Sequence, residues 1–597
     1  MSEHSPKKVI VIGGGPAGLT AAYELCKTGV ESIVLEKDNT VGGISRTVNY
    51  KDYFFDIGGH RFFTKVKAVD YIWREVLNRD LLRRNRLSRI YYDKKFFYYP
   101  LRPFNALSRL GVWSSLLIFL SYLRAQLFPD KPEKTFDQWV SNRFGKHIYS
   151  KFFKTYTEKV WGVQCSEISA DWATQRIQGL SLLTAVKNAF MNQNSKNKDA
   201  VVKTLIDTFN YPKRGPGMMW EAVADIVQKK GSHVRLGAEV ETILCKNNKV
   251  AALQLKVNGE TELVKGSHFI SSMPLRELVQ KFEPAVPEEV RKAAMNLKYR
   301  DFLTVALIIN KPDVFPDNWI YIHDPDVKVG RIQNFKNWSP HMVPDPHKTC
   351  VGLEYFCFEG DEFWSMPDQE LIEFGKRELN ILGLVCASDV EDGTVVRMPK
   401  AYPVYDSTYR ESLQIIRQFL SRIDNLQVVG RNGMHRYNNQ DHSMLTSMLA
   451  VENIVGANHN LWQVNEEKEY HEEVVTKPSK RTDLEELFTG AFTRMDKLGF
   501  AIALGSVSGL LIFMATILLV LKGGEVVGPN LQLLSQYFFG YTVTVKGAFI
   551  GLAYTFSWGF LLGWLFSYLR NFFLAIFIYR TKRKTELLLF RDFLDNF

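Results

Sequence analysis

The chain has 597 residues, of which 46% are apolar and 23% charged, and its formal net charge is +11. This length exceeds what a single hydrophobic core supports, so several domains are expected. The six cysteines form no CxxC pair, which argues against a zinc site and a disulfide framework, so we expect no metal and a reduced, cytosolic setting.

The first predicted element, at residues 8–12, is a buried strand that runs into a glycine-rich loop without a preceding signal peptide. Its β-branched apolar residues favour a parallel sheet, and the spacing after the loop predicts a helix at residues 19–27. In the loop, Gly13 permits a tight turn, Gly15 lets the backbone approach a pyrophosphate, and Gly18 lets helix and strand pack closely. The helix N-terminus would then face the phosphates with its partial positive charge.

A second expected strand, at residues 32–35, ends at Glu36. A carboxylate there would accept hydrogen bonds from a ribose and disfavour a 2′-phosphate, which indicates a non-phosphorylated adenosine. The alternative is a structural βαβ unit without a ligand. Two glycine pairs follow, and they would let the backbone lie against a large, flat group. The residues expected to bind a cofactor here are Gly42, Gly43, Arg46, Gly58 and Gly59, with His60 and Arg61 directly after them.

Residues 79–102 hold eight basic and two acidic residues, interleaved with tyrosine and phenylalanine. Such a stretch suits single-stranded nucleic acid, an anionic substrate or anionic lipid. Because long apolar runs follow on the same chain, we favour lipid or substrate and expect no nucleic-acid partner. The apolar stretch at residues 110–123 is too short to span a bilayer, so it is either a core helix or a helix lying in the membrane interface.

Two uncharged runs near the C-terminus, residues 498–521 and 547–569, are each long enough to cross a bilayer as a helix. Buried helices of a soluble domain are the alternative. Basic residues gather before the first run and after the second, so the positive-inside rule predicts a multi-pass protein of the inner or plasma membrane with its catalytic region in the cytoplasm. Small-xxx-small spacing predicts that the spans pack on each other or on a second copy of the chain. In the second case the protein would be a homo-oligomer. The pairs are Gly505 and Gly509, Gly547 and Gly551, and Gly559 and Gly563.

A late glycine-containing segment, residues 430–441, lies about 410 residues after the first glycine loop. With the loop at residues 13–18, Glu36 and Gly42-Gly43, it resembles FAD proteins of the amine oxidase and protoporphyrinogen oxidase superfamily. Residues 156–162, 402–406 and 430–441 are more narrowly similar to UDP-galactopyranose mutases. The resemblance covers residues 7 to 465 and leaves out the membrane tail.

The resemblance implies an α/β fold in which a Rossmann-type FAD-binding domain carries a helical insertion and a β-rich substrate domain, here followed by transmembrane helices. We place the FAD domain at residues 1–66, 206–284 and 416–465, the insertion at 67–205 and the β-rich domain at 285–415. Residues 466–493 then form a linker, and residues 494–597 form the membrane anchor.

In the mutases, the resemblance implies that reduced flavin acts on the sugar without net electron transfer. Such a site needs cations for a diphosphate and a cleft that excludes water. The catalytic candidates are His60, Arg61, Trp161, Arg176, Arg397, Tyr402 and Tyr405, while Gly430, Arg431, Tyr437 and Asp441 are expected near the flavin. Each has a structural alternative: the aromatic residues packing in a core, an arginine in an ion pair, or His60 bonding only to backbone.

Three functions follow from these patterns. The first is a membrane-anchored flavoenzyme that isomerises a nucleotide-linked or polyprenyl-linked sugar for cell-surface glycan assembly. The second is a flavin oxidoreductase that acts on an apolar lipid, polyprenoid or porphyrin-like molecule delivered from the bilayer. The third is a membrane scaffold that keeps FAD only as a structural element.

Overall fold

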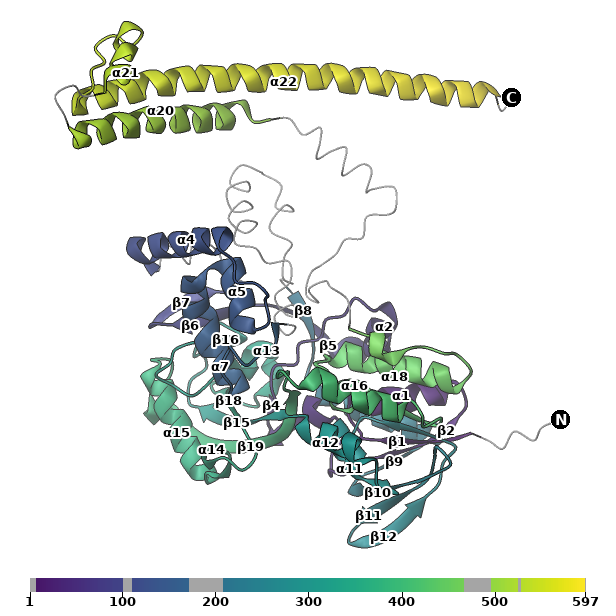
Figure 1. Cartoon of the computed structure of the whole chain (residues 1–597). Helices are drawn as coiled ribbons and strands as arrows, with labels where there is room; N and C mark the ends of the chain where they lie inside the picture. The colour runs from purple at the N-terminus through teal and green to yellow at the C-terminus, as the bar shows by residue number, and fades with distance from the viewer. Residues whose placement is uncertain (1–6, 100–109, 171–207, 466–494, 524–527, 596–597) are drawn as a thin grey trace. The chain divides into compact units, whose positions relative to one another are not determined.

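The computed structural model describes residues 7–99, 110–170, 208–465, 495–523 and 528–595. The chain divides into two compact units, Met1–Val474 and Val475–Phe597 (Figure 1).

A five-stranded parallel sheet organises the nucleotide-binding part of the first unit, in the order β20-β13-β1-β2-β9. Its strands are β20 (Leu426–Val428), β13 (His268–Ser271), β1 (Lys8–Ile12), β2 (Glu31–Leu35) and β9 (His233–Arg235). Neighbouring strands come from early, middle and late parts of the chain. The expected α/β fold, with a sheet assembled from distant segments, is confirmed.

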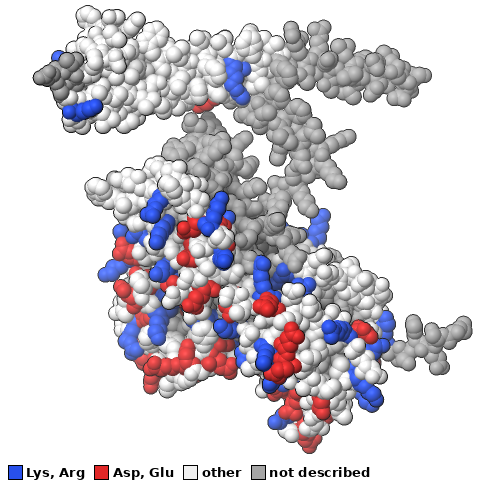
Figure 2. Space-filling model, in the orientation of Figure 1, with Lys and Arg blue, Asp and Glu red and all other residues white. Residues whose placement is uncertain are grey.

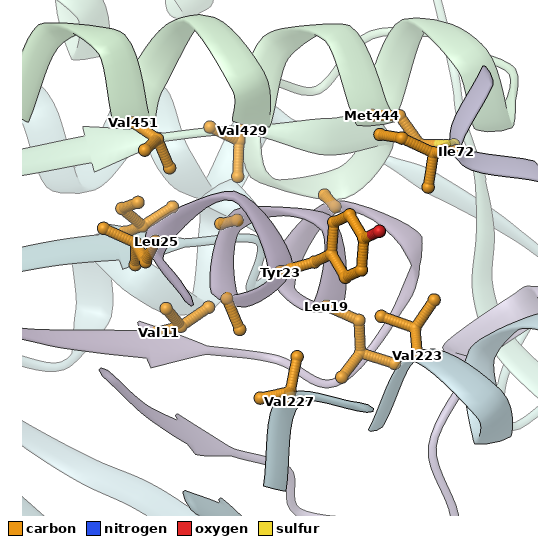
Figure 3. Close-up of a cluster of buried hydrophobic side chains, with 14 of the residues drawn as sticks. Val11, Leu19, Tyr23, Leu25, Ile72, Val223, Val227, Val429, Met444 and Val451 are labelled. Atoms are coloured by element: carbon orange, nitrogen blue, oxygen red, sulfur yellow. The ribbon is translucent and has the colours of Figure 1, made fainter. Parts of the chain in front are cut away.

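Alternate residues of β1 enter two different cores, because successive side chains of a strand point to opposite faces of the sheet. Val9 and Val11 pack with helices α1 (Pro16–Lys27), α2 (Lys67–Leu77), α10 (Gly217–Lys229) and α18 (Gln440–Ile454). Figure 3 shows this core, in which Leu19 and Tyr23 of α1 lie among valines of α10 and α18. Ile10 and Ile12 pack on the other side, with helices α11 (Leu275–Gln280), α12 (Glu288–Asn296) and α16 (Tyr409–Leu420).

A four-stranded sheet, in the order β12-β11-β10-β14, borders this second core. Its strands are β10 (Ala238–Lys246), β11 (Lys249–Val257), β12 (Glu260–Val264) and β14 (Phe282–Glu283). Helix α12 lies in the segment assigned to the substrate domain, yet its buried residues belong to the core of the nucleotide-binding part. That domain boundary is therefore corrected: α12 packs with the FAD domain because its apolar face meets α16 and α11.

The third sheet has seven strands in the order β19-β15-β18-β17-β16-β6-β7, all antiparallel neighbours except the parallel pair β16–β6. Its strands are β6 (Ser88–Tyr92), β7 (Lys95–Tyr98), β15 (Tyr299–Ile309), β16 (Trp319–Ile322), β17 (Arg331–Asn334), β18 (Thr349–Cys357) and β19 (Val390–Pro403). Helix α15 (Asp368–Ile381) covers one face through leucines that join its core. Short helices α13 (Phe335–Trp338) and α14 (Glu362–Ser365) complete this part.

The segment predicted to be a helical insertion, residues 67–205, is only partly helical, and this expectation is corrected. It contributes β5 (Leu81–Asn85) and the hairpin β6–β7, which extends the seven-stranded sheet through pairing with β16. The apolar and aromatic residues of the hairpin pack into two cores on opposite faces, so its basic residues do not define a separate arm. Strand β5 pairs with β8 (Thr208–Pro212), and β3 (Thr47–Tyr50) pairs with β4 (Tyr53–Asp56). Among the described residues, the segment also contains α2, α4 (Val112–Leu127), α5 (Phe136–Phe144), α6 (Lys146–Ile148) and α7 (Thr155–Trp161).

The second unit is an antiparallel helix hairpin of α20 (Lys497–Lys522) and α22 (Val545–Asp595), with the short α21 (Pro529–Gln532) between them. Lys497–Lys522 and Val545–Ile576 are long and apolar enough to cross a membrane, and they include both predicted runs. The backbones approach closely at the glycines: a Cβ on Gly559 would lie 3.0 Å from the Cα of Gly505. The small-xxx-small spacing thus serves contact within one chain, and pairing with a second copy stays a prediction.

Candidate active site

A cavity of about 1190 Å³ lies between the five-stranded and seven-stranded sheets of the first unit. Its lining comes from the loop between β1 and α1, the end of β2, helix α7, strands β16, β17 and β19, and the segment from α17 (Gly430–Gly433) to α18. The first and last glycine segments meet here, since a Cβ on Gly430 would lie 2.9 Å from the Cβ of Ala17. The two ends of the nucleotide-binding part therefore share one site, as the sequence predicted.

The structure gives a different reason for the presence of glycine at each of three positions in the first loop. Gly13 has a φ of +100°, and a side chain there would overlap Ser272. A Cβ on Gly18 would overlap the backbone oxygen of Gly13, so only glycine lets α1 pack this closely on the loop. Gly15, by contrast, has no atom nearer to its Cβ position than the Cα of Gly43, at 3.9 Å, and it lines the cavity. Two side-chain-free backbones thus face each other in front of the N-terminus of α1, an arrangement whose space and partial positive charge suit a pyrophosphate.

Glu36 lies at the end of β2 and lines the same cavity. Its Oε2 accepts a hydrogen bond from the backbone N–H of Gly14 at 2.6 Å, and its Oε1 accepts one from Asp38 at 2.9 Å. Burial raises the pKa of this carboxyl above its ordinary value, while the two backbone donors oppose that shift. Each carboxylate oxygen retains a further lone pair, so Glu36 is able to accept from ribose hydroxyls. Arg46, also in the lining, donates to Asp38 at 2.6 Å and so fixes the loop after Glu36.

The glycine pairs lie beside this cradle. Gly43, Gly58 and Gly59 line the cavity, and Gly42, with a φ of +100°, packs directly on Arg46 behind it. His60 follows the second pair, and its Nε2 lies 2.7 Å from the carbonyl of Ile57. Because that carbonyl only accepts, Nε2 carries the proton. Burial, and next the positive charge of Arg431 and Arg331, lower the pKa of His60 to about 4. His60 is therefore neutral at physiological pH and has a structural bond to backbone.

A cationic wall faces these glycines from the seven-stranded sheet. Arg331 on β17 lines the cavity, and one of its terminal nitrogens lies 3.8 Å from the Cβ position of Gly58. The buried Glu354 holds it, accepting from Nε at 2.9 Å and Nη2 at 2.5 Å, and Gln333 also donates to that carboxylate. Arg61 lines the cavity with its guanidinium 5.6 Å from the ring of Trp319.

Sequence reasoning missed Arg331. Its only signal is the alternation of Arg331 and Gln333 in a short strand, and such alternation ordinarily indicates a solvent-facing side. Around it lie Tyr156, Tyr321 and His323, further lining residues that were not among the predicted site residues, although Tyr156 begins one of the motifs. The rings of Tyr156 and His323 stack at 4.5 Å, and burial lowers the pKa of His323 to about 3.

The aromatic candidates form one group with Arg431. Tyr402 and Tyr437 stack with ring centres 5.4 Å apart, and Trp161 meets both edge-on. The guanidinium of Arg431 lies 4.8 Å from the ring of Tyr437 and donates through Nε to the carbonyl of Asn438 at 2.8 Å. All four side chains line the cavity, and so does the nearly buried Asp441 in the first turn of α18.

Of the three remaining candidates, the structure describes Tyr405 and Arg397. Tyr405 lies outside the cavity lining: its hydroxyl accepts from the backbone N–H of Tyr437 at 2.7 Å and its ring stacks on Tyr409, so it supports Tyr437 from behind. Arg397 reaches the lining, where its guanidinium binds Asp368 and two backbone carbonyls, and its role as a second cation of the site stays a prediction. Arg176 lies outside the described residues.

The cavity changes character toward helix α4. Its lining there is mainly apolar, with Ser115 as an exception, and comes from α4 and the residue before its glycine, α5, α6 and the π-helix Tyr149–Lys154: Leu110, Ile118, Phe119, Phe144, Ile148, Phe152 and Phe153. One end of the cavity thus suits a charged nucleotide, the middle suits an anion beside rings, and the far end suits hydrocarbon.

The chain matches the family of flavin-containing amine oxidoreductases over residues 16–438, which is most of the chain. Among curated proteins it is similar to the L-amino-acid oxidase of Crotalus adamanteus, with 26% identity over 331 residues, covering 51% of this chain and 58% of the snake protein. It thus spans little more than half the length of the curated relatives it matches.

Two solved structures share the fold. A reduced UDP-galactopyranose mutase superposes with a TM-score of 0.67 at 21% identity, covering 77% of this chain and 98% of the mutase. A putative protoporphyrinogen oxidase from Exiguobacterium sp. 255-15 superposes with a TM-score of 0.57 at 15% identity, covering 75% and 99%. The open face of Gly15, the carboxylate of Glu36 and the N-terminus of α1 fit the dinucleotide that such proteins bind. The chain belongs to the family of flavin-containing amine oxidoreductases, and its cofactor is FAD.

Proposed function

We propose that the protein is a membrane-anchored FAD enzyme that acts on a nucleotide-linked or polyprenyl-linked sugar, in the manner of a UDP-galactopyranose mutase, in cell-surface glycan biosynthesis. The observation that carries this proposal is the wall made by Arg331, Arg61 and the tyrosines Tyr156, Tyr321 and Tyr402. Guanidinium groups bind phosphate oxygens with paired hydrogen bonds, and phenol rings stack on bases and sugars. A wall of this composition suits a phosphorylated sugar better than an amino acid or an amine.

The residues have distinct parts in this function. Bound FAD supplies electron-pair and redox chemistry that no side chain of the cavity offers. The backbones at Gly15 and Gly43 and the N-terminus of α1 hold its pyrophosphate, and Glu36 holds its ribose. Arg331 positions the phosphate of the substrate, and the fixed carboxylate of Glu354 keeps the guanidinium in place, so little reorganisation is needed when the substrate binds.

The two candidate membrane spans support a glycan substrate. The spans Lys497–Lys522 and Val545–Ile576 are the candidate anchor, and the basic residues that flank them in the sequence favour a cytoplasmic active site in the inner or plasma membrane. Sugars for surface glycans are assembled on lipid carriers at such a membrane, so an anchored enzyme would remain near its substrate.

A second candidate function is oxidation of an apolar or lipid substrate. The observation in its favour is the hydrocarbon-like end of the cavity, lined by Leu110, Ile118 and Phe119. The family itself is named for amine oxidoreductases, and oxidases occur among its relatives.

One experiment separates the two. The purified chain is reduced chemically and incubated with UDP-galactopyranose and other nucleotide sugars, and product is compared with reductant consumed. Turnover that needs reduced flavin but consumes no stoichiometric reductant supports the isomerase. Product formed only with an oxidant, one equivalent per turnover, supports the oxidoreductase and overturns the first proposal.

A further inference from the structure

The inner side of α4 carries the buried Ile118 and Tyr122 together with Ser121 and Gln126. The hydroxyl of Ser121 accepts from the backbone N–H of His147 at 3.0 Å, and the amide of Gln126 donates to the carbonyl of Asn142 at 3.0 Å. Gly145 lets the helix sit close, because a Cβ there would lie 2.8 Å from the backbone nitrogen of Tyr122. These contacts fix which face of α4 meets the protein.

The outward face of α4 is apolar. Its large exposed side chains are Trp113, Leu116, Leu117, Phe119, Leu120, Leu123 and Leu127, and Phe128 follows directly. Trp113 is 79% exposed and Leu127 71% exposed. A helix on a water-facing surface ordinarily has the opposite arrangement, with polar side chains outside and apolar ones inside. An exposed contiguous apolar strip of this kind marks a surface that another apolar phase covers.

Positive charge predominates in the segment that carries the strip. Residues 110–154 contain seven basic and three acidic residues. The basic side chains are Arg124 on α4, Lys131 and Lys134 before α5, Arg143 at its end, Lys146 on α6, and Lys151 and Lys154 beyond it. Of these, Arg143 is paired with Glu133. Figure 2 shows the uncharged strip of α4 along one edge of the first unit, with Lys and Arg side chains interspersed with acidic ones beneath it. Apolar and aromatic residues bordered by cations are the signature of a helix lying in the headgroup region of an anionic bilayer.

The same helix borders the active-site cavity. Ser115, Ile118 and Phe119 of α4 line the cavity that also contains Gly15 and Arg331. Phe119 is both a lining residue and 56% exposed, so the apolar end of the cavity lies next to the outward strip. A hydrocarbon chain in the membrane would therefore find an apolar path from the strip toward the cationic wall.

We propose that α4 lies in the surface of an anionic bilayer and that the substrate enters the cavity from the lipid, as an amphiphile with a phosphorylated head and a hydrocarbon tail. This inference rests on the proposed function for the phosphorylated head, and it adds the lipid tail and the route. The head binds at Arg331, the tail lies along Ile118 and Phe119, and the bilayer covers the leucines of α4.

The docking is tested on the full chain with bound FAD, reconstituted in vesicles of phosphatidylethanolamine and phosphatidylglycerol. Leu117→Cys is labelled with an environment-sensitive fluorophore in a Cys386→Ser background, since Cys386 is the exposed native cysteine among the described residues. The matched control is Ile381→Cys on α15, which is 58% exposed against 50% for Leu117. Lipids that carry a nitroxide near the headgroup should quench the label at 117 about threefold more strongly than the label at 381, and aqueous iodide should show the reverse order.

Equal quenching of the two labels by iodide and by lipid would overturn the docking. Protection of residue 117 from iodide without lipid quenching would also overturn it, because a second copy of the chain would then cover the strip. Trp113→Cys with the same label repeats the test if the first variant folds poorly. Exchange of phosphatidylglycerol for phosphatidylcholine should weaken lipid quenching at 117, and unchanged quenching would refute the role of the anionic surface. The labels report position whether or not a sugar is turned over, so failure here and failure of the mutase proposal are distinct.

The route is tested with a phosphorylated amphiphile, farnesyl diphosphate, against inorganic diphosphate. The amphiphile should perturb the absorption spectrum of the bound flavin at a concentration at least about tenfold lower than inorganic diphosphate, because its tail buries apolar surface in the cavity. Phe119→Ser should reduce that difference. Equal concentrations for the two compounds would overturn the route while leaving a phosphate site intact.

Discussion

Substitution of Gly15 by alanine should separate cofactor binding from folding. In the structure, the new methyl group would be 3.9 Å from its nearest neighbour, the Cα of Gly43, and it would point into the cavity. The backbone of Gly15 has a φ of −82°, which alanine adopts without strain. The protein without FAD should therefore accept the change, whereas the pyrophosphate should not.

The expected change in apoprotein stability follows from two opposing effects, and the expected change in FAD affinity follows from one lost hydrogen bond. Gly15 is the N-cap of α1, where alanine costs about 0.5–1 kcal/mol relative to glycine, while loss of chain freedom in the unfolded state returns about 0.4–1 kcal/mol. The stability of the apoprotein should thus change by less than about 0.5 kcal/mol. Loss of one hydrogen bond to a charged phosphate costs about 1.5–3 kcal/mol, so FAD affinity should fall about 10- to 100-fold.

Gly18→Ala is the matched control. Its Cβ would overlap the backbone oxygen of Gly13, and overpacking of this kind costs about 1–3 kcal/mol or more. FAD titration of the detergent-solubilised apoprotein measures affinity, and thermal unfolding without FAD measures stability. Gly15→Ala should lose affinity at unchanged Tm, and Gly18→Ala should lower Tm. If Gly15→Ala bound FAD as the parent does, the assignment of the pyrophosphate to this cradle would be wrong.

Four further changes test other parts of the structure. Glu36→Gln should weaken FAD binding about tenfold, measured by the same titration, because an amide oxygen is a weaker acceptor for ribose hydroxyls. Arg331→Gln should lower the free energy of unfolding by about 3–5 kcal/mol, because it leaves the buried carboxylate of Glu354 without its cation. The double variant with Glu354→Gln should regain the Tm of the parent but not sugar turnover. Recovery of both would exclude Arg331 as a substrate contact. Gly559→Leu should push α22 away from α20, because its Cβ would lie 2.9 Å from the hydroxyl of Ser508. A cysteine pair introduced across the two helices should then no longer form a disulfide, and persistent crosslinking would contradict the packing. Burial lowers the pKa of His435 from 6.5 to about 4. Between these two pH values the unfolded chain binds a proton that the folded chain does not, so the free energy of unfolding falls by about 1.4 kcal/mol for each pH unit of acidification. His435→Gln should therefore show a shallower fall in Tm over this range, and an unchanged slope would refute the reasoning.

The site could be predicted from sequence where local chemistry decides structure. A strand, a glycine loop and a helix in succession impose their own geometry, so the residues at Gly13, Gly15, Gly18 and Glu36 are identifiable without long-range contacts. Uncharged runs of transmembrane length are equally local, because their composition and length are read directly.

Side-chain direction was not predictable, because pairing between distant strands sets it. Arg331 reaches the cavity since β17 pairs with β18, which places Glu354 beside it. Tyr402 and Tyr405 are three residues apart in the sequence, yet one lines the cavity and the other packs behind Tyr437.

The sequence by itself therefore determined the dinucleotide cradle, the flavin family and two candidate spans, because each depends on neighbours in the chain. Only the tertiary structure decided that the hairpin β6–β7 joins the substrate sheet and that a cationic wall faces the flavin cradle. It also decided which side of α4 is exposed. The contacts of Ser121 and Gln126 with the segment around His147 and Asn142 fix the inner side, so the leucines lie outside.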